Sequence, residues 1–137
     1  MTCFWDGIFK ALKKQDFLIF NMCEKPNNIK QFIRFLQKNN LKVVNVTWNG
    51  EILTKQELEE HKKAVELFDL SKIHNGYLCS TCDSFLLLIS QLFQMNIHHI
   101  FNGNKIKYIN SLNNTTKNPK ILYFSSNKSH FRYDKRT

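Results

Sequence analysis

The sequence predicts an α+β fold in which helices come first and most of the strands come late. Three observations lead to this class. The chain has 137 residues, the length of a single domain with one core. Apolar residues make up 42% of it, so a compact core is expected rather than disorder. Apolar side chains recur at helical spacing over much of residues 4–93, whereas short runs separated by turn signals follow residue 95.

Two helices are expected before residue 40. Residues 4–14 carry apolar side chains on one helical face, which places Cys3 at the N-terminus and Asp6 in the first turn, where a negative charge suits the helix dipole. A second amphipathic helix is expected from Pro26 to Asn39, because proline is tolerated in the first helical turn.

The middle of the chain predicts a short strand and two further helices. Residues 41–48 are rich in β-branched side chains, as in a strand, and Asn49-Gly50 is a turn signal. Thr54, followed three residues later by Glu57, is typical of a capping box that begins a helix. Residues 85–93 are apolar almost all round, so we expect them to form the most buried helix.

The last third of the chain predicts strands. Residues 96–101 and 105–109 flank Asn102-Gly103 and form the clearest hairpin in the sequence. Residues 120–124 and 129–133 follow as two further strands. We expect these late strands to form one antiparallel sheet, with the N-terminal helices packed against it.

Composition and charge narrow the function classes. Lys and Arg number 20 against 11 Asp and Glu, for a formal net charge of +9. The basic residues are scattered and match no nucleic-acid motif, so we interpret them as a solvated surface and expect no nucleic-acid partner. No apolar run approaches the ~20 residues that cross a bilayer, and no secretory signal is visible, so we expect no membrane association and a cytoplasmic location. Without a glycine-rich phosphate loop, no cofactor is expected. We also expect a monomer.

The four cysteines are Cys3, Cys23, Cys79 and Cys82. Without a secretory signal, they predict free thiols in a reducing compartment. Cys79 and Cys82 form a Cys-x-x-Cys unit, which could complete a zinc site with Cys23 and either His74 or His61. The unit alone is half a site, so structural thiols are favoured and metal ligation by Cys79 and Cys82 stays an alternative.

Cys3 is the candidate nucleophile. The free N–H groups and the dipole at a helix N-terminus stabilise a thiolate. Acyl transfer also needs an imidazole that takes up the thiol proton and returns it to the leaving group. The five histidines are His61, His74, His98, His99 and His130.

Three blocks of sequence carry a family resemblance. In Cys3–Ile8, a cysteine is followed by two large apolar residues, a variable residue, a glycine and an aliphatic residue. Residues 83–97 read as a buried helix that runs into a strand, and residues 120–124 precede a polar turn and then His130-Phe131. In this order the blocks resemble the ovarian-tumour (OTU) family of deubiquitinating cysteine proteases, compact viral members in particular, within the papain-like superfamily.

The resemblance implies a papain-like, OTU-like compact fold and a thiol protease that cleaves ubiquitin or ubiquitin-like conjugates, with a viral polyprotein as a further substrate. Cys3 would attack the carbonyl after the terminal glycine of ubiquitin, and His130 would act as general base and then as general acid. The implied partner is ubiquitin or a ubiquitin-like protein. For a viral enzyme, the implied location is the host cytosol and the implied role is evasion of innate immunity.

The chain departs from the family pattern before the cysteine. The family usually has an Asp three residues upstream, whereas only Met1 and Thr2 precede Cys3. We therefore expect residues 1–137 to be a single protease domain excised from a larger polyprotein, with Met1 as an introduced start.

A second departure leaves the orienting catalytic residue open. The family often carries Asn or Asp two residues after the histidine, where this chain has Arg132. Asp134 lies four residues past His130 on the same strand parity and is one candidate to orient the imidazole. Asn127 is another, and neither matches the family motif.

Two alternatives remain. In papain-like viral proteases the histidine opens a strand hairpin and an Asn or Asp follows on the return strand, a layout that His98 or His99 and Asn110 share. The catalytic set would then be Cys3, His99 (or His98) and Asn110. From another class, the net charge of +9 is compatible with a non-catalytic basic module that binds nucleic acid or a host protein with strong salt dependence.

Overall fold

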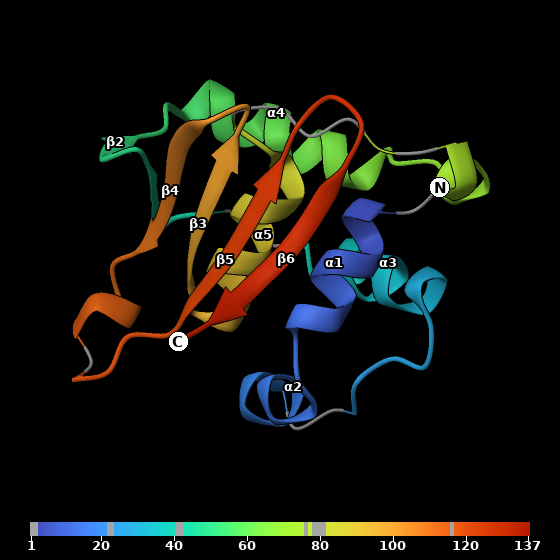
Figure 1. Cartoon of the computed structure of the whole chain (residues 1–137), viewed down its shortest axis with the longest axis horizontal. Coiled ribbons are helices and arrows are strands. Elements are labelled where there is room, and N and C mark those ends of the chain that lie inside the picture. The colour runs from blue at the N-terminus through green and yellow to red at the C-terminus, as the bar shows by residue number, and fades with distance from the viewer. Residues whose placement is uncertain (1–2, 22–23, 41–42, 76, 78–81, 116) are drawn as a thin grey trace.

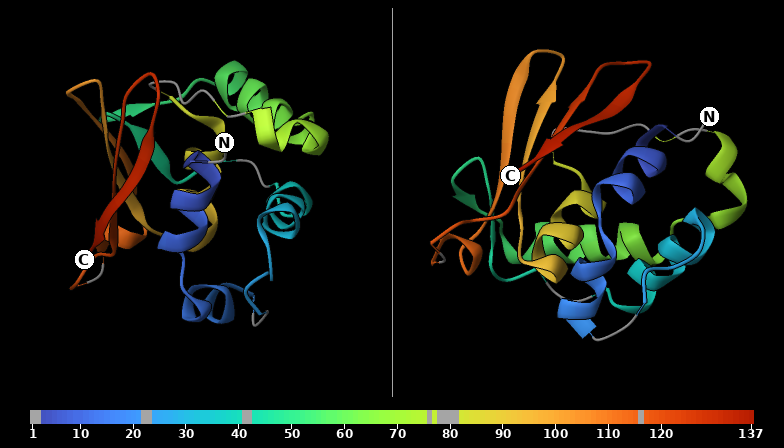
Figure 2. Two further views of the ribbon diagram at one scale, coloured as in Figure 1. Left: turned by 45° about the vertical axis from the view of Figure 1, so that its right-hand side comes forward. Right: turned by 60° about the horizontal axis from the view of Figure 1, so that its bottom comes forward.

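A computed structural model describes residues 3–21, 24–40, 43–75, 77, 82–115 and 117–137. The helices of this part of the chain are Cys3–Ala11 (α1), Lys14–Asn21 (α2), Ile29–Lys38 (α3), Lys55–Glu66 (α4) and Ser84–Phe93 (α5), with 3-10 turns at Leu70–Asn75 (η1) and Asn113–Thr115 (η2). The strands are Val46–Trp48 (β1), Glu51–Ile52 (β2), Asn96–Phe101 (β3), Asn104–Asn110 (β4), Ile121–Ser126 (β5) and Phe131–Arg136 (β6). The helices lie to one side of the sheet (Figure 2), which confirms the α+β class.

The sheet is mixed, so the expectation of an antiparallel sheet of late strands was wrong. Its order is β2-β1-β4-β3-β5-β6, and β3 pairs with β5 in parallel. The reason is where the segments between β4 and β5 lie: β4 ends where β3 begins, and at that end of the sheet Asn113 is hydrogen-bonded to Lys120, whose carbonyl accepts the N–H of Asn96. β5 therefore enters level with β3, with Asn96 opposite Ile121. The early strands β1 and β2 also extend the sheet beyond β4.

The first predicted helix is split in two. α1 ends at Ala11, and α2 begins at Lys14. The backbone N–H of Lys13 donates to the carboxylate of Asp16 at 2.7 Å, which satisfies an N–H that would be unpaired at the start of α2. The predicted continuous helix 4–14 therefore breaks at Leu12, because a local side-chain acceptor begins a new helix there.

Side-chain caps decide where the next helices begin. α3 starts at Ile29 rather than at Pro26, because Asn28 accepts the N–H of Gln31 and acts as its N-cap. The capping box predicted from Thr54 and Glu57 is confirmed, with both reciprocal hydrogen bonds present at the start of α4.

The core lies between the helices and the sheet, and α5 fills its centre. All but two residues of α5 are buried, as expected, and this helix rather than an N-terminal one covers the middle of the sheet (Figure 1). Trp5 of α1 is fully buried and packs edge-on against Phe85 of α5, with 4.7 Å between ring centroids. Within the described residues, no helix has the length and apolar character to cross a membrane.

α1 lies directly against β6, the last strand. Gly7 makes this approach possible: a Cβ at that position would lie 3.2 Å from Cδ1 of Phe131 and 3.5 Å from the backbone nitrogen of Tyr133. One turn earlier, the rings of Phe4 and Phe131 pack with their centroids 4.8 Å apart. The first turn of α1 and the β5–β6 turn are thus brought to the same end of the molecule (Figure 1).

Candidate functional site

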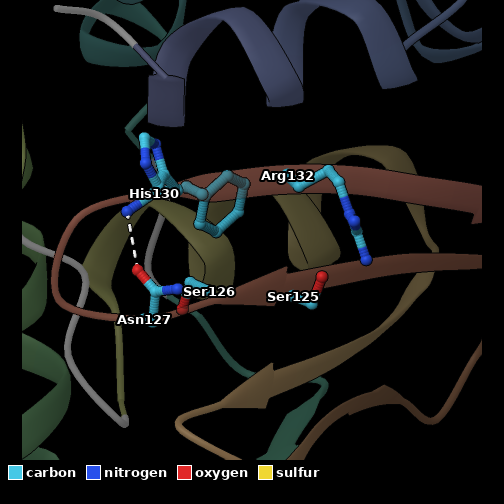
Figure 3. Close-up of a pocket in the computed structure, with 6 residues that line it drawn as sticks. Ser125, Ser126, Asn127, His130 and Arg132 are labelled. Atoms are coloured by element: carbon cyan, nitrogen blue, oxygen red, sulfur yellow. Dashed lines mark hydrogen bonds between the residues drawn. The ribbon is translucent and has the colours of Figure 1, made fainter.

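The turn between β5 and β6 holds His130 through its backbone. The side-chain oxygen of Asn127 accepts the N–H groups of Ser129 and His130 at 2.8 and 2.9 Å, and the N–H of Asn127 donates to the carbonyl of His130 at 2.9 Å. Figure 3 shows the bond from His130 to Asn127. Asparagine suits this position because its short side chain accepts backbone N–H groups two and three residues ahead. The turn therefore fixes where the His130 side chain leaves the backbone.

The side chain of His130 is exposed and borders an open pocket of about 500 Å³. The pocket is lined by Ser125, Ser126, Asn127, His130, Phe131 and Arg132. In Figure 3 the imidazole points away from the sheet, toward the first turn of α1. Because its side chain is exposed, His130 can be reached by a ligand that enters the pocket from solvent.

Cys3 is the first residue of α1, and its free thiol is half-buried at the edge of the core. Cys3 directly precedes Phe4, and His130 directly precedes Phe131, so the contact of these two rings brings the two backbones together. Among the described residues, no hydrogen bond joins the thiol to the imidazole. In unliganded enzymes such bonds are often long and tighten when substrate binds.

The predicted orienting residues do not contact the imidazole within the described structure. The carboxylate of Asp134 accepts Nε of Arg132 at 2.7 Å and the hydroxyl of Ser125 at 3.1 Å. Asp134 shares the face of Arg132, as strand parity predicts, but its carboxylate is bound there by Arg132 and Ser125. The strand bulges at this point: Tyr123 pairs with Lys135 and the next residue pairs with Tyr133, which leaves Asp134 as the extra residue. Asn127, the other candidate, binds the backbone of His130 rather than its ring.

The alternative pair His99 and Asn110 is not brought together. His99 is fully buried, and its Nε2 lies 2.6 Å from the hydroxyl of Ser126. Burial lowers the pKa of His99 to about 4. Asn110 lies at the other end of the hairpin, where its amide donates to the carbonyl of Ser90 and its oxygen accepts two backbone N–H groups. His98 points to the opposite face of the sheet from His99, as alternation along a strand requires.

A different cysteine and histidine lie in contact. Sγ of Cys82 is 3.4 Å from Nε2 of His61, and Nδ1 of that ring is 2.7 Å from the hydroxyl of Ser84. Burial raises the pKa of Cys82 to about 12, with the carboxylates of Asp83 and Glu57 adding to the shift. Burial also lowers the pKa of His61. Both groups are therefore neutral near pH 7, which suits a structural link between α4 and α5 rather than a nucleophile.

The metal alternative gains no further ligand from the structure. Cys23, Cys79 and the side chain of His74 lie outside the described residues. In the remainder of the chain, no group of three His, Cys, Asp or Glu side chains is arranged to hold a metal ion.

The comparisons with known proteins found no match, whether to a protein-family model, to a curated protein or to a solved structure. Local sequence identified Cys3 and His130 one at a time, but it missed the contact of Phe4 with Phe131 and the pair of Cys82 with His61. No local pattern signals such contacts between distant segments. The turn made by Asn127 does have a local signal, because an asparagine often accepts the N–H groups two and three residues after it.

Proposed function

We propose that this protein is a cysteine protease of the ovarian-tumour type that acts on ubiquitin or ubiquitin-like conjugates, with Cys3 as nucleophile and His130 as general base and acid. The observation that carries the proposal is the ring contact between Phe4 and Phe131, centroids 4.8 Å apart, because Cys3 and His130 each directly precede one of these residues. The order of the three sequence blocks supports the same assignment.

The chemistry follows from the two side chains. His130 accepts the thiol proton, and the sulfur of Cys3 attacks the carbonyl carbon of the C-terminal glycine of the modifier. The bond from that carbon to the substrate amine breaks, His130 returns the proton to the amine, and a thioester remains on Cys3. Water then gives a proton to His130 and attacks the thioester, which releases the modifier as a carboxylate and restores the thiol.

The first turn of α1 supplies what the developing oxyanion needs. The first N–H groups of a helix have no acceptor within that helix, so they can donate to a negatively charged oxygen beside its first residue. The helix dipole acts in the same direction. The exposed imidazole and the open pocket leave the solvent side of the pair accessible to an extended peptide tail.

A ubiquitin probe with an electrophile at its C-terminus tests the proposal. We expect one covalent adduct with the wild type, none with Cys3→Ala, and labelling slowed by roughly 10²–10⁴-fold in His130→Gln. The matched controls are Cys82→Ser, which removes the other described thiol, and His98→Gln, which changes a histidine on the face of β3 opposite to that of His99. Both should label at the wild-type rate.

Three other outcomes of the labelling experiment would contradict or change the proposal. The proposal fails if a folded wild-type chain forms no adduct, or if the adduct persists in Cys3→Ala. Loss of labelling in His99→Gln with full labelling in His130→Gln would move the role of base to His99. Failure of all probe labelling would leave the non-catalytic binding module as the better description.

A further inference from the structure

The positive charge of this protein is concentrated in its last four strands. Residues 96–137 hold 8 of the 20 basic residues but only one of the 11 acidic residues, Asp134. Residues 1–95, which supply the helices, hold 12 basic and 10 acidic residues and are nearly neutral. Strong charge asymmetry between two parts of a chain points to a polyanionic partner for the charged part.

The register of the sheet arranges part of this charge in rows. Lys107 of β4 pairs with His98 of β3, His98 pairs with Tyr123 of β5, and Tyr123 pairs with Lys135 of β6. These four residues therefore form one row across four adjacent strands, a width of about 14 Å at the usual strand spacing. A lysine stands at each end of the row, and two rings stand between them.

A second row lies beside the first. Lys105 pairs with Ile100, Ile100 pairs with Ser125, and Ser125 pairs with Arg132. This row also begins and ends with a cation. Asp134 is ion-paired with Arg132 at 2.7 Å, so the one carboxylate of this part of the chain is already bound.

Both rows lie on the face of the sheet away from the helices. His99, on the opposite face of β3, is buried, whereas Ile100 is 40% exposed and Lys105, Lys107 and Lys135 are exposed. In Figure 1 this face is turned toward the viewer and α5 lies behind it. We call this surface, made by the two rows, the open face.

Two rings lie next to each other at the centre of the open face, and a lysine contacts one of them. His98 and Tyr123 meet edge to face with 5.1 Å between centroids, and Nζ of Lys135 lies 4.9 Å from the Tyr123 centroid. Aromatic side chains between cations are the usual means by which a sheet surface stacks bases and holds phosphates. An acidic protein would use the cations but would gain little from the rings.

We propose that the open face binds single-stranded nucleic acid, with phosphates on Lys105, Lys107, Arg132 and Lys135 and bases stacked on Tyr123 and His98. Ser125 and Arg132 of this surface also line the pocket beside His130, but Lys105, Lys107, His98 and Tyr123 do not, and the proposal does not depend on the protease assignment. It revises the expectation that the basic residues form only a solvated surface, because the paired strands bring together lysines that are scattered along the sequence.

Fluorescence anisotropy with a labelled oligouridylate tests the proposal. Four neutralised phosphates predict a slope of about −3 for the logarithm of affinity against the logarithm of salt concentration. Lys105→Glu with Lys107→Glu should weaken binding by at least about tenfold and halve that slope. Lys62→Glu with Lys63→Glu on α4 makes the same change in net charge outside the open face and should change affinity less than about twofold.

A second pair of variants tests the rings. Tyr123→Ala should weaken oligouridylate binding by about tenfold, since it removes a ring on which a base stacks, and Tyr123→Phe should bind as the wild type does because it keeps that ring. Circular dichroism and thermal melting of each variant establish that it is folded.

Any of four results would overturn the proposal. Three concern affinity: no oligouridylate binding at low salt, equal weakening by the two double variants, or a duplex that binds as tightly as the single strand. The fourth is that polyglutamate competes with oligouridylate as well as unlabelled oligouridylate does, and that its own binding is unchanged by Tyr123→Phe and by Tyr123→Ala. The last result would assign the face to an acidic protein. Cys3→Ala should bind oligouridylate normally, and the open-face double variant should react normally with the ubiquitin probe. Failure of one proposal is thereby distinguished from failure of the other.

Discussion

Arg136 in the last strand donates two hydrogen bonds of 2.7 Å to the two carboxylate oxygens of Asp16, at the start of α2. The carboxylate is almost fully buried, with 1% of the side chain exposed, and the guanidinium is 20% exposed. Bidentate geometry of this kind is the strongest form of ion pair in proteins. The Phe4–Phe131 contact holds the first residue of β6 against α1, and the ion pair holds Arg136, at the other end of β6, against α2. The candidate site therefore depends on the position of this strand.

Asp16→Asn should therefore destabilise the protein. The substitution leaves a partly buried guanidinium without its charge partner, and the loss should be about 3 kcal/mol in the free energy of unfolding measured with urea. Asp134→Asn breaks the exposed pair with Arg132 and serves as the matched control, with an expected loss below about 1 kcal/mol. Equal losses for the two variants would contradict the assigned role of Asp16.

The carboxylate of Asp16 also predicts that the free energy of unfolding depends on pH in the acid range. Burial acts to raise the pKa of Asp16, but the hydrogen bonds from Arg136 and Lys13 and the charge of Arg136 outweigh it and lower the pKa below 3.8. The stabilisation is thus fully present above pH 3.8 and is lost as pH falls through the lowered pKa. Urea titrations of wild type and Asp16→Asn should converge below that range and stay apart above it.

His99 predicts a second pH dependence, in a higher range. Burial lowers its pKa to about 4 from the ordinary value of 6.5, so the unfolded chain binds a proton that the folded chain does not bind. The free energy of unfolding should fall by about 2 kcal/mol as pH falls from about 7.5 to about 5, at 1.36 kcal/mol per pH unit below 6.5. His99→Gln, which can still bond to Ser126, should flatten this slope, whereas an unchanged slope would show that the proton binds elsewhere.

Gly7→Ala should disturb the candidate site through packing alone. Its methyl group would meet the Phe131 ring at 3.2 Å and press α1 away from β6. Overpacking costs about 1–3 kcal/mol and the better helix propensity of alanine offsets about 1, so we expect a net loss of about 1 kcal/mol. Labelling by the ubiquitin probe, if the proposed function is right, should slow severalfold because Cys3 and His130 separate.

Gly50→Ala is the control for this change. Gly50 has a φ of +82° with open space around it, so alanine there costs backbone strain without touching the site. It should lower stability by about 1 kcal/mol and leave the labelling rate unchanged. If the Gly7→Ala chain labels at the wild-type rate, the packing of α1 against β6 does not affect the reaction of Cys3 with the probe.

The described cysteines should differ sharply in reactivity. The raised pKa of Cys82, about 12, keeps its thiol protonated near neutral pH, whereas the thiol of Cys3 lies at the start of α1 beside N–H groups that have no acceptor within the helix. Brief alkylation with iodoacetamide followed by peptide mass spectrometry should find Cys3 modified first. Preferential modification of Cys82 would instead identify the Cys82–His61 pair as the reactive one.

The parts of the fold that the sequence determined are those with local causes. The capping box at Thr54 and the hairpin turn at Asn102-Gly103 depend on residues three or fewer positions apart, and both are confirmed. The apolar run 85–93 likewise produced the most buried helix. In each case a short segment can satisfy its own hydrogen bonds or bury its own apolar side chains only in one way.

Tertiary structure decided what depends on pairing between distant segments. The parallel pairing of β3 with β5 followed from where β4 ends and β5 begins, and a bulge in β6 placed Lys135 opposite Tyr123. Cys3 and His130 were chosen by residue type and resemblance, but only the packing of Phe4 against Phe131 brings the segments that carry them together. Composition likewise revealed a net charge of +9, and only strand register gathered Lys107 and Lys135 into one row. These four features have the same physical reason: hydrogen bonds between strands and contacts between layers join residues that no local spacing relates.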